Sequence, residues 1–178
     1  MNLRKKINNS MLELAQRDIT LEETEAIVNA ANKTLSPGGG VSGAIHRTAG
    51  QGLWEGAKSI GGCGTGEARI TGGYGLQAKY VIHTVGPFYR GSERDLQNLK
   101  NSYYNSLVLA LKNNIKSISF PSISTGIFGY PIEDASRIAF KTIINFLMDY
   151  QEIELIKMVL FSDSDYQIYK NSLKNILK

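Results

Sequence analysis

The feature that most constrains the fold of this chain is the alternation of short apolar segments with longer helical ones. Six segments have the length and pattern of β-strands: residues 11–15, 26–28, 67–71, 80–85, 117–120 and 155–161. Four others are expected to be helices: residues 42–50, 93–113, 132–150 and 165–177. Strands that alternate with helices form βαβ units, so we predict an α/β fold with a largely parallel sheet and helices on both of its faces.

The length and composition of the chain are those of one folded domain. It has 178 residues, of which 42% are hydrophobic, and no repeat, low-complexity tract or Pro/Ser-rich linker divides it. We therefore expect residues 1–178 to form a single domain.

The composition argues against several classes of protein. No apolar run approaches the roughly 18 residues of a membrane span, and the basic residues 1–6 are not followed by the apolar stretch of a secretory signal. We therefore expect a cytoplasmic protein without a membrane partner. Cys63 is the single cysteine, and His46 and His83 are the two histidines, so we expect no disulfide, no metal site and no cofactor. We interpret Cys63 as a packing residue, and His83, which lies inside an apolar strand, as a hydrogen-bonded core residue.

Two glycine-bearing loops each follow a predicted strand and precede a predicted helix. The first spans residues 29–41, with three consecutive glycines at 38–40, and the second spans residues 122–131. In open α/β sheets, ligands bind beyond the carboxyl ends of the strands, and consecutive glycines let the backbone approach a ligand closely. The helix that begins near Ser42 would direct its unpaired N–H groups toward an anion.

Neither loop has the pattern of a common nucleotide-binding motif. No GK[ST] follows the glycines, which excludes a Walker P-loop, and neither loop has the GxGxxG spacing of a Rossmann turn. Each loop alone is equally well explained as a turn. Two such loops in equivalent positions, both offering successive backbone N–H groups, favour a diphosphate held between them.

Several motifs, in this order and spacing, resemble those of macrodomains, and most closely those of the MacroD-type hydrolases. The similarity covers about residues 11–170 and is carried by Asp18-Ile19-Thr20, Ala26-Ile27-Val28-Asn29-Ala30-Ala31-Asn32, Gly38-Gly39-Gly40-Val41, Gly43-Ala44-Ile45-His46-Arg47, Tyr80-Val81-Ile82-His83-Thr84-Val85-Gly86-Pro87 and Ile123-Ser124-Thr125-Gly126. The resemblance implies a three-layer α/β/α fold with a mixed, largely parallel sheet and a crevice that binds ADP-ribose.

The resemblance also implies roles for individual residues. Asp18 would accept a hydrogen bond from the adenine amino group, the Ile19 N–H would lie beside it, and Phe161 would stack on the base. Asn32 would bind the distal ribose, and Asn29 would support its loop. The remaining contacts implied come from the two loops: Gly39, Gly40 and Val41 at the distal ribose and one phosphate, and Ser124, Thr125, Gly126, Ile127 and Phe128 around the diphosphate, with Phe128 also packing on the distal ribose.

Some of these residues have a structural interpretation as well. Asp18 can cap a helix or a turn, and Phe161 can belong to the core. His46 lies four residues after Ser42 on the same face of the predicted helix. It either orients a group at the distal ribose or has a structural role.

Two positions depart from the MacroD pattern. Ser42 stands where the family has an aspartate that helps to activate the attacking water, and a serine is no general base near neutral pH without a partner. Other macrodomains that lack this acid still hydrolyse ADP-ribosyl esters, with the substrate phosphate positioning the water, so we assign Asn32, Ser42 and His46 to the catalytic centre. Arg17 replaces the glycine that often precedes the Asp-Ile-Thr motif, which is expected to alter the strand exit near adenine.

Three functions are compatible with the resemblance and the charge. We expect binding of ADP-ribose or of an ADP-ribosylated protein, with hydrolysis of mono-ADP-ribosyl esters on proteins or of O-acetyl-ADP-ribose. A non-catalytic reader of ADP-ribose is the alternative that Ser42 favours. The net charge of +4 and the pI of about 9.1 also suit a module that binds RNA or poly(ADP-ribose), although an anionic nucleotide accounts for the same charge.

Overall fold

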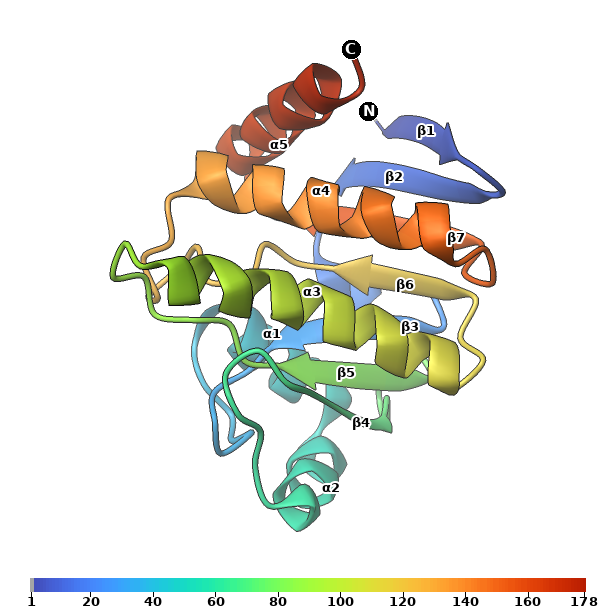
Figure 1. Ribbon diagram of the computed structural model, residues 1–178. Helices are drawn as coiled ribbons and strands as arrows, with labels where there is room; N and C mark the ends of the chain where they lie inside the picture. The colour runs from blue at the N-terminus through green and yellow to red at the C-terminus, as the bar shows by residue number, and fades with distance from the viewer. Residues whose placement is uncertain (1) are drawn as a thin grey trace.

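The centre of the structure is a seven-stranded sheet with the order β1-β2-β7-β6-β3-β5-β4 (Figure 1). The computed structural model describes residues 2–178. The strands are β1 (Leu3–Ile7), β2 (Ser10–Gln16), β3 (Ala26–Ala30), β4 (Ala68–Gly72), β5 (Tyr80–Thr84), β6 (Ser117–Phe120) and β7 (Leu155–Leu160). The helices are α1 (Gly40–Ala49), α2 (Gln51–Ile60), α3 (Glu93–Lys112), α4 (Ile132–Asp149) and α5 (Asp163–Ile176), and a 3-10 turn, η1, spans Ile19–Leu21.

Five neighbouring strands are parallel, and one antiparallel strand lies at each edge. The strands β2, β7, β6, β3 and β5 run in one direction, whereas β1 pairs antiparallel with β2, and β4 pairs antiparallel with β5. Figure 1 shows α3, α4 and α5 on one face of this sheet and α1 on the other. The prediction of a three-layer α/β/α fold with a mixed, largely parallel sheet is confirmed.

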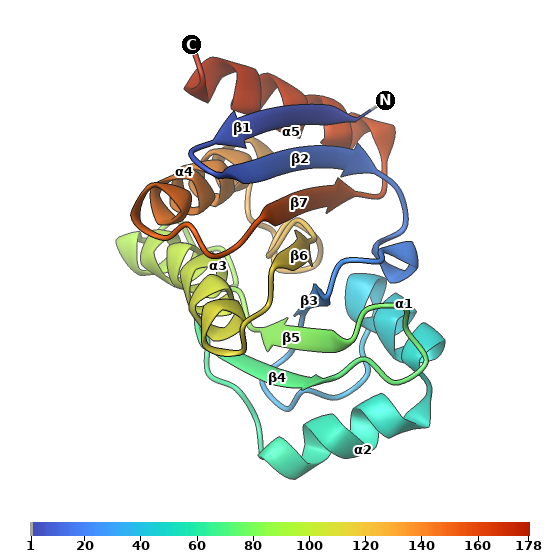
Figure 2. The ribbon, with the colours of Figure 1, turned by 90° about the vertical axis from the view of Figure 1, so that its right-hand side faces the viewer.

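Alternate residues of the strands build a core on each face of the sheet. On one face, Leu12 and Leu14 of β2 belong to a large core with the apolar sides of α3, α4 and α5, including Phe140. On the other face, Ile27 of β3 belongs to a smaller core with Ile45 of α1. Helix α1 covers only part of this second face. In Figure 2 no helix lies in front of β1, β2 and β7.

Each predicted segment corresponds to a strand or helix, with ends shifted by at most two residues, but β1, η1 and α2 were not predicted. The strand β1 is a run of exposed basic residues between Leu3 and Ile7, so it lacks the apolar alternation of a strand. The helix α2 contains Gly52 and Gly56, which lower its helical propensity. The ring of Tyr74 packs on these glycines, and a Cβ at Gly52 would lie 2.7 Å from it. The packing of Tyr74 therefore explains why glycines stand at these positions. The same glycines are the reason why the sequence did not predict a helix here.

The described part of the chain, residues 2–178, contains no helix that is both long and apolar enough to cross a membrane. The same residues contain no group of three or more His, Cys, Asp or Glu side chains that could hold a metal ion. Cys63 is buried in a small cluster with Leu35 and Ala57, which confirms its interpretation as a packing residue.

Candidate functional site

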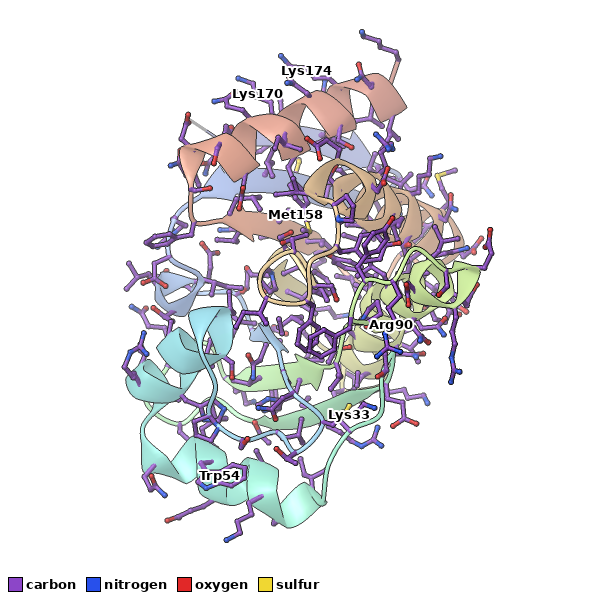
Figure 3. The ribbon with its side chains drawn as sticks, turned by 90° about the vertical axis from the view of Figure 1, so that its left-hand side faces the viewer. Lys33, Trp54, Arg90, Met158, Lys170 and Lys174 are labelled. Carbon is purple, nitrogen blue, oxygen red and sulfur yellow. The ribbon has the colours of Figure 1, made fainter. Side chains whose placement is uncertain are left out.

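The five parallel strands end at one edge of the sheet, and the predicted site residues gather there. In Figure 1 the arrowheads of β5 and β6 point to the left, and Figure 3 looks onto that side of the molecule. Asp18 follows β2, Asn32 follows β3, Gly86 follows β5, residues 121–131 follow β6, and Phe161 follows β7. This edge is where ligands bind in open α/β sheets.

A cavity of about 290 Å³ lies between the β3–α1 loop (residues 31–39) and the β6–α4 loop (residues 121–131). Most of the predicted site residues line it: Asn32, Gly39, Gly40, Val41, Ser42, Ser124, Gly126, Ile127 and Phe128. The other predicted site residues lie outside this lining: Asp18, Ile19, Asn29, His46, Thr125 and Phe161. The lining also includes residues that were not assigned to the site from the sequence: Ala30, Ala31, Gly38, Gly86, Ser122 and Ile123.

The helix α1 directs its N-terminus into this cavity. It begins at Gly40, two residues before the predicted start, and Gly39 is its N-cap residue. Gly40 has a φ of +54°, in the left-handed region that favours glycine. The N–H groups of the first helical turn have no acceptor within the helix, and Gly40, Val41 and Ser42 of this turn line the cavity. The positive end of the helix dipole is therefore available to an anion in the cavity.

Asn32 holds the β3–α1 loop in a tight turn. Its Oδ1 accepts a hydrogen bond from Ser36 N at 3.0 Å, and its Nδ2 donates to Ser36 O at 3.1 Å. Within this turn Leu35 has a φ of +61°, which is unusual for a bulky residue. The Leu35 side chain is fully buried, which offsets the strain. Asn32 thus fixes the conformation of the loop from a position in the cavity lining.

The β6–α4 loop presents a series of free backbone donors. Ser124 has a φ of +67°, and its carbonyl accepts a hydrogen bond from Tyr130 N at 2.9 Å. Among residues 2–178, no acceptor is present for the backbone N–H groups of residues 125–128. Strained backbone of this kind concentrates at functional sites, and successive free N–H groups form anion-binding concavities.

The segment after β5 forms a third wall, which the sequence analysis did not assign to the site. Phe88 stacks on Phe128, with ring centroids 3.9 Å apart, and Tyr89 N donates to Phe128 O at 2.8 Å. A Cβ at Gly86 would overlap Ser124 Oγ, so this close approach requires glycine. A Gly-Pro pair directly after an apolar strand was the signal that could have identified this wall.

Two buried tyrosines from the helical layer hold the start of the β6–α4 loop. Tyr169 OH, from α5, lies 2.7 Å from Ser122 Oγ, which is also 2.7 Å from Thr125 Oγ1. Tyr103 OH, from α3, accepts a hydrogen bond from Ile123 N at 3.2 Å. Burial raises the pKa of both tyrosines, that of Tyr169 to about 12, so both hydroxyls stay protonated. Nothing in the sequence pattern distinguishes these tyrosines from ordinary core residues.

A chain of buried and partly buried polar side chains links β3, β5 and β4. Asn29 Nδ2 lies 3.1 Å from His83 Nδ1, and His83 Nε2 lies 3.0 Å from Thr71 Oγ1. Because an amide nitrogen only donates, Nδ1 accepts and Nε2 carries the proton. Burial, together with a smaller effect of nearby His46, lowers the pKa of His83 to about 4. The ring is neutral, and the prediction of a hydrogen-bonded core histidine is confirmed. The side-chain hydrogen bond of Asn29 therefore goes to β5 and not to the β3–α1 loop, which Asn29 was predicted to support.

Ser42 and His46 lie one turn apart on α1, and both are buried. Burial lowers the pKa of His46. Among residues 2–178, Ser42 Oγ and both ring nitrogens of His46 have no hydrogen-bond partner, and neither do Asn29 Oδ1 and Ser124 Oγ. Buried polar atoms are normally paired. These atoms therefore represent unused hydrogen-bonding capacity on the elements that surround the cavity.

Asp18 and Phe161 lie at the ends of the neighbouring strands β2 and β7. Asp18 Oδ1 accepts hydrogen bonds from Thr20 N at 2.9 Å and Thr20 Oγ1 at 2.7 Å, so Asp18 does cap η1. No residue in the described range donates to its Oδ2, which leaves one oxygen for a ligand. Ile19 is buried beside Asp18. Phe161 is 80% exposed, so its interpretation as a core residue is wrong.

Basic side chains lie on the face that carries the cavity. Figure 3 shows Lys33 and Arg90 on this face, whereas Lys170 and Lys174 project from the outer side of α5. Lys33 and Arg90 are both exposed. Their charges raise the potential at the mouth of the cavity and suit an anionic ligand.

Comparisons with known proteins identify relatives of the chain. Residues 28–139 match a family model described as Macro domain. The human protein named ADP-ribose glycohydrolase MACROD2 is 48% identical over 172 residues, which cover 95% of this chain and 40% of that protein, so the chain spans about two fifths of this relative. A macrodomain of Oceanobacillus iheyensis, solved with ADP, matches with a TM-score of 0.96 at 43% identity, covering 99% of this chain and 97% of that chain. A Trypanosoma brucei macrodomain, solved in complex with ADP-ribose, matches with a TM-score of 0.87 at 40% identity, covering 91% and 68%.

Proposed function

The chain belongs to the macro domain family, and we propose that it binds ADP-ribose and hydrolyses mono-ADP-ribosyl esters on proteins or O-acetyl-ADP-ribose. The observation that carries this proposal is the cavity in which the N-terminus of α1 faces the free N–H groups of the β6–α4 loop. Two sets of backbone donors around one space suit a diphosphate. The ligand in the T. brucei relative and the name of the human relative support the same substrate class.

The two ends of ADP-ribose are assigned to the two sides of this cavity. Asp18 accepts a hydrogen bond from the adenine amino group through Oδ2, and the exposed ring of Phe161 stacks on the base. The distal ribose lies beside Asn32 and Gly39, and the ring of Phe128, supported by Phe88, packs on it. Every one of these side chains follows a parallel strand, so the sheet sets their spacing.

The catalytic end is assigned to Asn32, Ser42 and His46. In the hydrolysis the oxygen of a water molecule forms a new bond to the carbon whose ester C–O bond breaks, the carboxylate leaves from ADP-ribose, and the proton that the products do not retain passes to solvent. Ser42 Oγ can hold this water by a hydrogen bond, but no carboxylate stands at this position to take its proton. The substrate phosphate is the anionic group that positions the water, so catalysis depends on a well-placed ribose.

The proposed macromolecular partner follows from the same chemistry. An ADP-ribosylated protein is the proposed macromolecular substrate, because an ester at the distal ribose joins the nucleotide to a polypeptide. The cytoplasm is the proposed compartment.

A reader that binds ADP-ribose without hydrolysis is the second candidate. The specific observation that favours it is Ser42 in the first turn of α1, where the related hydrolases have an acid. Binding by the two loops does not need that acid, whereas water activation does.

Calorimetric titration followed by a de-modification assay tests both candidates. We expect ADP-ribose to bind in the micromolar range, roughly −8 kcal/mol, and AMP to bind much more weakly because it lacks the second phosphate and the distal ribose. Equal affinities for the two ligands would contradict the use of both loops. Release of ADP-ribose from a glutamate-linked ADP-ribosylated protein supports the hydrolase, whereas tight binding without release supports the reader.

A further inference from the structure

A polar row crosses four neighbouring strands on the second face of the sheet, where no helix lies in front of β1, β2 and β7 in Figure 2. The row consists of Arg4 on β1, Glu13 on β2, Lys157 on β7 and Ser119 on β6, which are direct register partners from each strand to the next. Glu13 lies between two residues of the large core, so its side chain points to the opposite face. Glu13 Oε2 lies 2.9 Å from Arg4 Nε, and Lys157 Nζ lies 3.9 Å from Glu13 Oε1.

Glu22 joins this polar row from the segment that follows η1. Its side chain is fully buried, and its Oε2 lies 3.0 Å from Lys157 Nζ and accepts a hydrogen bond from Ser119 Oγ at 3.2 Å. A buried carboxylate must be paired to remain charged. Glu22 is therefore fixed to β7 and β6. It also holds residues 17–21, which precede it in the chain, next to these strands.

Arg17 closes a ring over that segment. Its Nε lies 3.0 Å from Glu22 Oε1, and its Nη2 donates to Leu21 O at 2.9 Å. Its backbone N–H donates to Leu160 O at 3.0 Å, which fixes the start of the ring to the end of β7. Residues 17–22 thus form a ring that is closed by the guanidinium of Arg17, and Asp18 is one of the residues of this ring.

The ring and the polar row connect the two segments that were assigned to adenine. Asp18 lies between Arg17 and Glu22, and Phe161 follows the strand that contains Lys157. We propose that Arg17, Glu22 and Lys157 form a positioning device that fixes Asp18 relative to Phe161 and so sets the selectivity for the adenine base. This inference rests on the proposed binding of ADP-ribose and adds residues that do not touch the ligand.

The hydrogen bonding between Asp18 and the base predicts which ligands are sensitive to the position of Asp18. The carboxylate of Asp18 accepts a hydrogen bond from the 6-amino group of adenine, whereas hypoxanthine presents a 6-oxo group, which repels a carboxylate. Adenine is therefore preferred over hypoxanthine only while Asp18 is held at the correct place. Ribose 5-phosphate, which has no base, does not sense this position.

The test compares Arg17→Gln with Arg4→Gln, which is a matched control because each variant removes one guanidinium from a buried glutamate. Both arginine side chains are partly exposed, at 44% and 64%, so each variant is expected to fold. Affinities for ADP-ribose, its hypoxanthine analogue and ribose 5-phosphate are measured by calorimetry. Hydrogen exchange is measured at the amides of residues 20–22, which hydrogen-bond within the ring.

Arg17→Gln is expected to weaken ADP-ribose binding about 2- to 10-fold, the range of one hydrogen bond, and to reduce the preference over the hypoxanthine analogue. Affinity for ribose 5-phosphate should stay unchanged, and the amides of residues 20–22 should exchange faster without any ligand. Arg4→Gln should change none of these quantities.

Three results would overturn the inference, and they are distinguishable. If the wild type binds ADP-ribose but Arg17→Gln and Arg4→Gln behave alike, the positioning role is wrong and the proposed function stands. If the wild type binds no ADP-ribose, the proposed function fails and the inference fails with it. Equal loss of all three ligands in Arg17→Gln also contradicts the inference, because it shows a general effect on the fold.

Discussion

The hydroxyls of Tyr169 and Thr125 meet on one oxygen, Ser122 Oγ, each at 2.7 Å. Tyr169 belongs to the last helix, and Thr125 lies in the β6–α4 loop that is assigned to the diphosphate. Since Tyr169 is fully buried, its hydroxyl has no water to replace Ser122. The helical layer on one side of the sheet therefore sets the conformation of a loop at its edge.

Replacing Tyr169 with Phe should weaken ADP-ribose binding by about 3- to 10-fold and destabilise the fold by about 1 kcal/mol, the usual value of one hydrogen bond. The change removes the hydroxyl and keeps the ring, so packing is preserved. Calorimetry and urea unfolding measure the two effects. Tyr104→Phe, which removes a hydroxyl that hydrogen-bonds Tyr150 from an exposed residue of α3, is the control and should leave the ADP-ribose affinity unchanged. Unchanged affinity in Tyr169→Phe would show that the loop keeps its shape without this contact.

Asp18→Asn separates the two roles of Asp18. Asparagine still offers one oxygen to cap Thr20, so we expect little change in the free energy of unfolding. Its amide nitrogen, however, donates and cannot accept from the adenine amino group. ADP-ribose affinity should fall by about 1–3 kcal/mol, while ribose 5-phosphate should bind as before. A parallel loss for both ligands would mean that Asp18 acts on the fold and does not contact the base.

Single-turnover rates on a glutamate-linked ADP-ribosyl substrate decide the role of Ser42. If the substrate phosphate positions the water, Ser42→Ala should retain most of the activity, whereas Asn32→Ala should lose most of it because the ribose is misplaced. Asn32→Ala also removes the hydrogen bonds that hold Ser36, so its fold must be checked by circular dichroism.

Ser42→Asp restores an acid at the start of α1, where the helix dipole favours a carboxylate. We expect the rate to rise ~10- to 100-fold if the carboxylate acts as a general base. Repulsion between this carboxylate and the diphosphate should weaken binding and offset part of the gain. Activity in Ser42→Asp together with none in the wild type would identify the natural protein as a reader.

The folding stability should fall between about pH 6.5 and pH 4 because His83 is held neutral. Its folded pKa of about 4 lies below the unfolded value of 6.5, so in this range the unfolded chain binds a proton that the folded chain does not. The contribution of His83 is complete above pH 6.5 and is lost as the pH falls toward 4, to a total of about 3 kcal/mol. Urea unfolding at a series of pH values measures the slope. His83→Gln should flatten the slope, and an unchanged slope in that variant would assign it to other groups.

The sequence predicted the elements that have a local signal and missed those that depend on distant contacts. The apolar pattern of β7 and the spacing in α3 identify both elements without reference to the rest of the chain. By contrast, α2 is a helix because Tyr74 packs on Gly52 and Gly56, and β1 is a strand because β2 lies beside it. No local pattern contains that information.

The same distinction applies to the candidate site. The glycines of the two loops were recognisable because their sequence reports directly on backbone conformation. The supports of the site were not, since Tyr169 and Tyr103 have the spacing of core residues and Glu22 has the composition of a surface loop. Their partners lie far away in the sequence, and only the folded chain brings them together.

The pairing of β2 with β7 determines the order in which the site can be completed during synthesis. A ribosome releases the chain from its N-terminus, and β2 has no partner on this side until residues 155–160 have emerged. The two loops around the cavity belong to strands and helices that are made earlier, but the β6–α4 loop still lacks its contact with Tyr169 of α5 at that stage. The proposed pocket for the base forms when Phe161 arrives beside Asp18, and the contact between Tyr169 and Ser122 follows. A nascent chain lacking β7 and α5 would therefore have neither the pocket for the base nor the support of the diphosphate loop, so nucleotide binding waits until both elements have been made.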